Sequence, residues 1–306
     1  MLVDIHEQAR GRWRGILSHM GMSQKELSGK HTACPICHEG TDRFRFDNKD
    51  GNGTWICSHC GAGRGVDMVM ALKGMQFKDA VKEVQQLVGT SKAEPIKAGQ
   101  TEDQKRQFRQ NLWRASVPVT KGDEVDTYLA GRGLDRPRYA KSLRYCPDCR
   151  YSDTQRFPAM IAAVQDAGGI GVSLHRTFLL DGEKAPVDSP RMVTAGELPM
   201  GSAIRLSEPC RVLGIAEGIE TALAAWDLFG IPTWAAINAH LLANWEPPKG
   251  CEEVVIYGDN DSSFTGHAAS FALAKRLAHK GYDVAVRLPE RVGHDWADVH
   301  HLGGVK

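Results

Sequence analysis

The sequence contains eight cysteines, and the first four have the spacing of a metal site. Cys34, Cys37, Cys57 and Cys60 form the pattern C-x2-C-x19-C-x2-C, in which each pair presents two thiolates from one tight turn. Four thiolates that close a tetrahedron are typical of structural zinc. We therefore predict one zinc ion held by these cysteines. Three nearby histidines are alternative ligands: His31, His38 and His59.

Aromatic residues and arginines alternate between the two cysteine pairs. Segments 42–46 and 54–56 flank a glycine-containing turn at 50–53, which predicts a β-hairpin and hence a zinc ribbon. Bases of single-stranded nucleic acid stack on aromatic rings, and phosphates pair with guanidinium groups. Because side chains alternate along a strand, we expect one face to fill the core and only the other to touch a ligand. The residues predicted to contact nucleic acid are Arg43, Arg45 and Trp55.

Acidic residues follow the strands that we predict in the second half of the chain. Short apolar runs alternate there with helical patterns, which predicts a parallel sheet covered by helices. The carboxyl ends of parallel strands form one edge of a sheet, so the carboxylates should meet there. A cation relieves their mutual repulsion, and hard oxygen ligands favour Mg²⁺ or Mn²⁺. The predicted strands are 211–216, 232–237, 253–257 and 283–288, and the acidic residues are Glu217, Asp259, Asp261, Asp295 and Asp298.

Composition and charge describe a globular chain. Its 306 residues are 42% hydrophobic and 25% charged, which suits about two domains. The net charge of +1 hides opposite stretches: residues 105–156 carry twelve Lys and Arg against six Asp and Glu, and residues 210–261 carry two against eight. Such a pair fits a protein that holds a polyanion on one surface and cations on another. No apolar run approaches the ~20 residues that span a bilayer, so we expect a cytoplasmic protein without a membrane partner.

The domain organisation follows from these elements. Helical patterns at 4–20 and 66–87 flank the ribbon and enlarge it to a module over residues 1–89. Residues 90–104 have the composition of a linker. The basic segment 105–205 and an α/β domain over 206–302 follow. The predicted fold class is therefore α/β, with a small zinc-ribbon module and then a mainly parallel, Rossmann-like sheet.

Motifs in both halves resemble those of known families. VLGIAEG at 212–218, DND at 259–261 and GHD at 293–295 resemble the motifs of a Toprim domain, the metal-binding fold of bacterial-type primases, topoisomerases and certain nucleases. The first half resembles the primase zinc ribbon of phage and plasmid replication proteins. The motifs that carry this resemblance are CPIC at 34–37, DRFRF at 42–46, GTW at 53–55 and GVD at 65–67. The chain thus resembles a DNA primase of the phage, plasmid or integrated-element type.

The resemblance implies a reaction and roles for the acidic residues. Such a primase makes short RNA primers on a single-stranded DNA template from ribonucleoside triphosphates, by two-metal nucleotidyl transfer. Asp259 and Asp261 are implied as the metal ligands, with Asp295 and Asp298 as further candidates. Glu217 is implied either as a ligand or as the general base.

A basic subdomain is implied ahead of the Toprim motifs. RFP at 156–158, GGIG at 168–171 and LHRT at 174–177 are similar to the subdomain that precedes Toprim in bacterial-type primases. The similarity implies that phosphates of template or nucleotide contact Arg156, Arg176 and Lys184. The first Toprim motif departs from replicative bacterial primases, because Glu220 and Thr221 stand where those carry an Asp.

Two other functions use the same carboxylates: a Toprim nuclease, or a non-catalytic recombination scaffold that binds DNA. The presence of every acidic position favours an enzyme. No G-x-x-x-x-G-K-[ST] sequence occurs, so a replicative helicase, if one takes part, is expected to be a separate polypeptide. Cys146 and Cys149 are either half of a second metal site or a turn that resembles a zinc knuckle.

Overall fold

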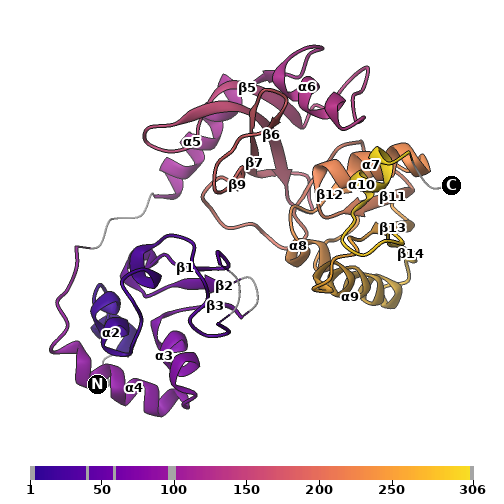
Figure 1. The fold of residues 1–306 in the computed structure, drawn as a ribbon. Helices are drawn as coiled ribbons and strands as arrows, with labels where there is room; N and C mark the ends of the chain where they lie inside the picture. Colours follow the sequence, from indigo (N-terminus) through magenta and orange to yellow (C-terminus); the bar gives the residue numbers. More distant parts are fainter. Residues whose placement is uncertain (1–3, 39–40, 58–59, 96–100, 304–306) are drawn as a thin grey trace. The chain divides into compact units, whose positions relative to one another are not determined.

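The computed structural model describes residues 4–38, 41–57, 60–95 and 101–303 (Figure 1). It divides into two compact units, residues 1–101 and 102–306. No helix of the described residues combines the length and the apolar character needed to cross a membrane.

The first unit combines a three-stranded antiparallel sheet with short helices (Figure 1). The helices are α1 (Ile5–Gln8), α2 (Trp13–His19), α3 (Gly65–Lys73) and α4 (Phe77–Val88), with 3₁₀ turns η1 (Glu26–Ser28) and η2 (Lys49–Gly51). The strands are β1 (Phe44–Phe46), β2 (Trp55–Cys57) and β3 (Gly61–Gly63), paired in the order β1-β2-β3. The predicted hairpin is therefore β1 and β2. The third strand is not predicted from the sequence, because its GAG segment has no alternation of apolar and polar side chains.

Glycines break each helix that we predict beside the ribbon. Gly11 (φ 73°) separates α1 from α2, and Gly74 (φ 62°) ends α3, so both positions have the left-handed backbone that glycine adopts without strain. Close packing also requires a glycine at the start of α3. A Cβ at Gly65 would lie 2.2 Å from the fully buried ring of Trp13. The core of this unit thus holds α2, α3 and the ribbon together.

The second unit is built on an eleven-stranded sheet. Its strands are β4 (Val117–Pro118), β5 (Leu143–Arg150), β6 (Arg156–Gln165), β7 (Gly171–Leu180), β8 (Glu183–Lys184), β9 (Arg191–Val193), β10 (Ala203–Ile204), β11 (Val212–Ala216), β12 (Thr233–Ala235), β13 (Glu253–Tyr257) and β14 (Asp283–Arg287). Its helices are α5 (Glu102–Ala115), α6 (Glu124–Gly131), α7 (Ile219–Phe229), α8 (Ala239–Ala243), α9 (Thr265–His279) and α10 (Trp296–His301). The last four strands are parallel, in the order β14-β13-β11-β12, and the other pairings are antiparallel.

Helices cover both faces of the parallel strands. Val255 and Tyr257 of β13 pack in one cluster with α7 and α10, whereas Val254 and Ile256 pack in another with α8 and α9. Strands that are buried on both faces have continuous apolar sequences, which is why EVVIY signals a strand without alternation. The predicted α/β class, with a small ribbon followed by a mainly parallel sheet, is confirmed.

The antiparallel part joins the parallel part without a break in the sheet. The two-residue strand β10 pairs with β12 on one side and with β6 on the other. β6 in turn pairs with β5 and β7, and β7 pairs with β8 and β9. Within this unit the basic segment and the acidic domain therefore share one sheet, and a boundary at 205/206 stays a prediction.

Candidate functional site

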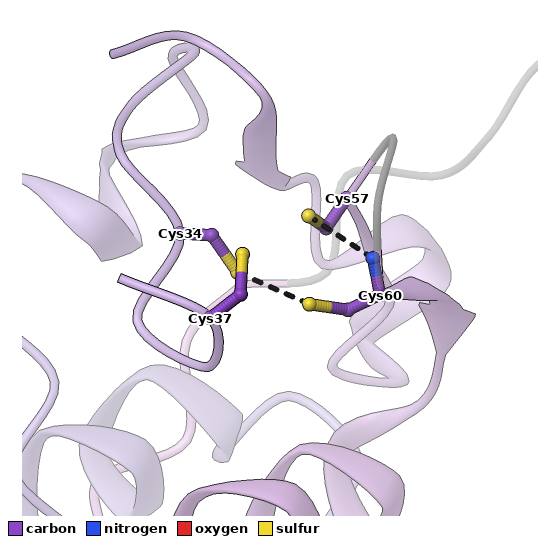
Figure 2. Close-up of side chains that lie close together, drawn as sticks. All are labelled: Cys34, Cys37, Cys57 and Cys60. Atoms are coloured by element: carbon purple, nitrogen blue, oxygen red, sulfur yellow. Dashed lines mark hydrogen bonds between the residues drawn. The ribbon is translucent and has the colours of Figure 1, made fainter. Parts of the chain in front are cut away.

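The four predicted zinc ligands converge in the first unit (Figure 2). Their sulfur atoms all lie within 4.8 Å of one another, and the sulfurs of Cys34 and Cys60 are 3.8 Å apart. A backbone amide donates to one thiol of each pair, since the amide of Ile36 donates to Cys34 Sγ and the amide of Cys60 donates to Cys57 Sγ, both at 3.4 Å. None of the eight cysteines forms a disulfide. The four cysteines form a zinc-binding site.

Electrostatics favour a cation at this cluster. Burial raises the pKa of the Cys34 thiol, and burial together with the neighbouring thiols raises that of Cys60. A bound zinc ion reverses both effects, because it stabilises thiolates. Among the described residues no histidine belongs to the cluster. His31 Nδ1 instead lies 2.7 Å from the carbonyl of Asp42, and His59 lies outside the described residues.

One face of the ribbon faces the core. Phe44 and Phe46 are fully buried, and Trp55, which lies opposite Phe46, is 6% exposed and donates its indole N–H to the carbonyl of Arg64 at 3.1 Å. Trp55 therefore lies in the core, although we predict it to contact nucleic acid. On the other face Arg45 pairs with Ile56, which is 46% exposed. Of the predicted contacts, Arg43 and Arg45 remain on the accessible side.

Strand register brings the acidic residues of the second unit to one edge. Ala216 at the end of β11 lies opposite Tyr257 at the end of β13, so Glu217 and Asp259 follow neighbouring strand ends. The amide of Asn260 donates to the carbonyl of His294 at 3.1 Å, which holds the loop after β13 against the segment before α10. Asp295 begins α10 and shares a capping box with Asp298. All the predicted acidic residues thus lie at the carboxyl end of the parallel sheet.

The environment of Asp259 favours a bound cation. Its Oδ1 atom is buried and has no hydrogen-bond partner among the described residues. Burial and the negative charges of Glu217 and Asp295 raise the pKa of Asp259 to about 7. Burial likewise raises the pKa of Glu217. A divalent cation would give this oxygen a partner and would offset the repulsion, so the residues present fit such an ion.

Asp261 has a different environment from Asp259, although both belong to the DND motif. Its carboxylate accepts hydrogen bonds from the amides of Thr265 (3.1 Å) and Gly266 (2.7 Å) and from the hydroxyl of Ser263. Burial opposes these hydrogen bonds, but they lower the pKa of Asp261 overall. Among the described residues no group of three carboxylates is close enough together to hold a metal ion by itself, so a cation here would need water ligands, as Mg²⁺ commonly keeps.

Cations from the antiparallel part approach this acidic edge. Lys184 of β8 pairs with Glu220 of α7, with Nζ and Oε1 3.1 Å apart. Arg191 of β9 is close enough to Glu217 to oppose the rise in its pKa. Sequence analysis predicts Lys184 but misses Arg191, because nothing in the PRM segment distinguishes it from a solvated arginine. Only the pairing of β9 with β7 places it here.

The other predicted phosphate contacts lie in different settings. Arg156 is half-exposed and pairs with Asp148, with Nε and Oδ2 2.8 Å apart. Arg176 is only 7% exposed; it donates to the carbonyl of Arg150 at 3.1 Å and lies over the rings of Phe108 and Phe178. Phosphate contact by Arg176 stays a prediction, and its burial gives it a competing role in packing.

Cys146 and Cys149 lie in β5, on either side of a bulge. Successive side chains alternate along a regular strand, so residues three apart would face opposite ways. The extra residue in the bulge lets both thiols face the core, where Cys146 is 3% and Cys149 1% exposed. Among the described residues no third cysteine, histidine or carboxylate joins the pair. The feature is therefore a bulged strand and not a knuckle-like turn.

The fold and its two sites define a zinc-ribbon protein with an acidic sheet edge on an α/β domain. A family model described as the zinc-binding domain of primase-helicase matches residues 29–66, and one described as a Toprim domain matches residues 212–305. A domain of unknown function (DUF7146) matches residues 103–206. The chain therefore combines a primase-type zinc ribbon with a Toprim domain, as the sequence resemblance predicts.

Solved primase structures share similarity along the chain. The primase fragment of the bacteriophage T7 primase-helicase protein is 15% identical with a TM-score of 0.42, over 89% of this chain and 94% of that one. The Aquifex aeolicus primase, with zinc-binding and RNA polymerase domains, is 16% identical with a TM-score of 0.40, over 99% and 83%. A DNA primase domain from Pseudomonas aeruginosa is 13% identical with a TM-score of 0.40, over 66% and 74%.

Proposed function

We propose that this chain is a DNA primase that synthesises short RNA primers on single-stranded DNA in phage, plasmid or mobile-element replication. The observation that supports it most is the combination of a primase-type zinc-binding domain with a Toprim domain in one chain. The acidic edge would supply the chemistry that such a reaction needs, because Glu217 and Asp259 lie at neighbouring strand ends and Arg191 is close enough to Glu217 to affect its pKa.

The acidic residues have distinct roles in the proposed reaction. Glu217 and Asp259 would hold the cation directly, with Asp261, Asp295 and Asp298 as further ligands of the metal or of its water shell. Two Mg²⁺ or Mn²⁺ ions bound there would act as Lewis acids on the attacking and leaving oxygens of the nucleotidyl transfer. Glu217 would otherwise accept the proton of the attacking 3′-hydroxyl, which its raised pKa suits.

Basic residues would bind the polyanions. Lys184 and Arg191 would contact phosphates of the incoming ribonucleoside triphosphate, and Arg156 would contact the template from the same antiparallel part. In the first unit Arg43 and Arg45 would hold single-stranded template against the ribbon. A separate replicative helicase is a further proposed partner.

The decisive experiment incubates the purified protein with single-stranded circular DNA, labelled ribonucleotides and Mg²⁺, and resolves the products on a denaturing gel. We expect new oligoribonucleotides, and we expect Asp259→Asn to reduce them at least about 100-fold, because a neutral amide holds Mg²⁺ poorly. Asp283→Asn is the matched control, since Asp283 is exposed at the opposite, amino-terminal end of β14.

The same gel distinguishes the alternatives. A nuclease would shorten the template in Mg²⁺ without nucleotides, and Asp259→Asn would abolish that cleavage. A scaffold would bind the template and leave it unchanged. Near wild-type synthesis by Asp259→Asn would show that this carboxylate does not hold the catalytic cation.

A further inference from the structure

Glu220 is a buried carboxylate that the Toprim motifs do not account for. It lies in the first turn of α7, three residues after Glu217, and is 7% exposed. A carboxylate removed from water is strongly destabilising unless cations or hydrogen-bond donors compensate it. The partners of Glu220 therefore indicate why the charge is kept.

Both side-chain partners of Glu220 come from the matched domain of unknown function. The hydroxyl of Tyr128, in α6, donates to Oε1 of Glu220 at 2.6 Å, and Nζ of Lys184, in β8, lies 3.1 Å from the same oxygen. Burial alone would raise the pKa of Glu220, but Lys184 and the Tyr128 hydroxyl outweigh it and lower that pKa to about 2. Glu220 is thus an ionised partner of Lys184.

The geometry lets Lys184 contact a second anion while it neutralises Glu220. Its side chain is 28% exposed, whereas that of Glu220 is 9% exposed, so the ammonium lies at the edge of the buried cluster. Nζ also lies 6.0 Å from the centroid of the fully buried Tyr128 ring, which limits where it can move. An ammonium has three protons, and Glu220 takes one of them.

We propose that Glu220 is a positioning residue that, with Tyr128, holds the ammonium of Lys184 where it contacts the phosphates of an incoming nucleoside triphosphate. The inference rests on the proposed function, which brings that nucleotide to the acidic edge of the sheet. The position follows from the chain, because Glu220 lies in the first turn of α7, three residues after Glu217, beside which the metal-bound phosphates would lie. A pre-held cation loses less side-chain entropy on binding than a free lysine does.

Glu220→Gln tests this role, because glutamine keeps the size and the hydrogen bond but removes the charge. We expect the KM for nucleotide to rise about 10-fold with a much smaller change in kcat, since the lost contact concerns binding. Equilibrium binding of a fluorescent ATP analogue, measured without template, should weaken by a similar factor. Tyr128→Phe should produce a smaller change in the same direction.

A double-variant cycle tests whether Glu220 acts through Lys184. Lys184→Met should weaken ATP binding, and Glu220→Gln combined with Lys184→Met should bind no more weakly than Lys184→Met alone. Additive losses in the double variant would overturn the proposal, because Glu220 would then act by another route.

A second ion pair on α7 provides the structural control. Arg136 and Asp227 also join the domain of unknown function to this helix, with NH2 and Oδ1 2.8 Å apart. Asp227→Asn should lower the Tm but leave the KM and ATP binding unchanged. The same pattern in Glu220→Gln would overturn the proposal and leave a purely structural pair. Absence of primer synthesis by the wild type would refute the proposed function, whereas ATP binding would still decide the role of Glu220.

Discussion

Strand β7 buries polar side chains that lack complete hydrogen bonding. Nδ1 of His175, Nε of Arg176 and Oγ1 of Thr177 have no partner among the described residues, and each side chain is at most 8% exposed. A buried polar atom without a partner destabilises a fold by about 1–3 kcal/mol. Packing alone would favour apolar residues on such a strand. Polar residues that reduce stability near the acidic edge are expected where function constrains the sequence.

His175 makes the stability of the protein depend on pH. Burial lowers its pKa from 6.5 to about 4, with Arg191, Arg176 and Lys184 adding repulsion that Glu220 partly offsets. Between pH 6.5 and about pH 4, His175 therefore carries a proton in the unfolded chain but not in the folded chain. Above pH 6.5 His175 is neutral in both states, so it does not lower the free energy of unfolding. From pH 6.5 towards pH 4 we expect that free energy to fall by up to about 1.4 kcal/mol per pH unit.

Urea unfolding of His175→Gln between pH 7 and pH 5 measures this contribution. The variant should lose less stability than the wild type over that range, and the difference between the two proteins cancels the effect of acid on the zinc thiolates. His279→Gln is the control, because His279 is exposed at the end of α9. Equal pH slopes in the wild type and in His175→Gln would show that His175 is protonated as easily when folded as when unfolded.

The DND motif shows what sequence can predict about single residues. Its place after a strand follows from the apolar run EVVIY, and the convergence of carboxylates follows from parallel strands. The contrast between Asp259, with a partnerless oxygen, and Asp261, with three hydrogen bonds, depends on contacts with residues 263–266 at the start of α9 and with His294. No local sequence pattern encodes these contacts, so the sequence alone implies the same metal-binding role for Asp259 and Asp261.

At the scale of elements, alternation predicts faces but not register. The segment 42–46 separates Phe44 and Phe46 from Arg43 and Arg45 correctly. The position of Trp55 depends on the connection between β1 and β2, where Asn48 and Asp50 have positive φ and the 3₁₀ turn η2 begins one residue before the predicted turn at 50–53. That turn sets Trp55 opposite Phe46 and hence in the core. The helix breaks at Gly11 and Gly74 also depend on backbone conformation, because both glycines have positive φ.

The outward face of the ribbon should carry its affinity for single-stranded DNA. We expect Arg45→Ala to weaken binding of an oligonucleotide and to lower the salt slope by about one, without loss of zinc, because one phosphate contact disappears. Trp55→Phe should instead lower the Tm, since its indole N–H loses the Arg64 carbonyl inside the core.

Fluorescence anisotropy at several salt concentrations measures DNA binding by both variants, and thermal unfolding measures their Tm. Lys82→Ala removes an exposed charge from α4, away from the ribbon strands, and serves as the control. Weaker DNA binding by Trp55→Phe at an unchanged Tm would return Trp55 to the set of nucleic-acid contacts.

At the scale of the whole molecule, cysteine spacing and strand patterns predict a zinc module followed by an α/β domain. The continuity of the second unit could not be predicted, because β10 is only two residues long and carries no periodicity. That short strand connects the basic and acidic parts through β6 and β12. This connection places Lys184 and Arg191 of the basic segment near the acidic edge.

Zinc removal should affect the two units differently. Cys34 and Cys57 belong to the core of the first unit, so loss of the zinc ion would remove a cross-link that ties the two cysteine pairs together there. The second unit has its own cores and holds none of the four ligands. We therefore expect the wild type to contain one zinc ion, and Cys57→Ser to lose most of it together with the unfolding transition of the first unit.

Calorimetry and metal analysis of the full chain test this expectation. A chelator should abolish one thermal transition and leave the other within about 2 °C, while binding of the fluorescent ATP analogue persists and initiation on single-stranded DNA is lost. Cys210→Ser controls for the general effect of removing a thiol, because Cys210 lies outside the zinc cluster. Loss of both transitions on chelation would mean that the units fold as one. A stoichiometry near two would instead assign a metal to the pair Cys146 and Cys149, against the bulged packing that places them in an apolar core.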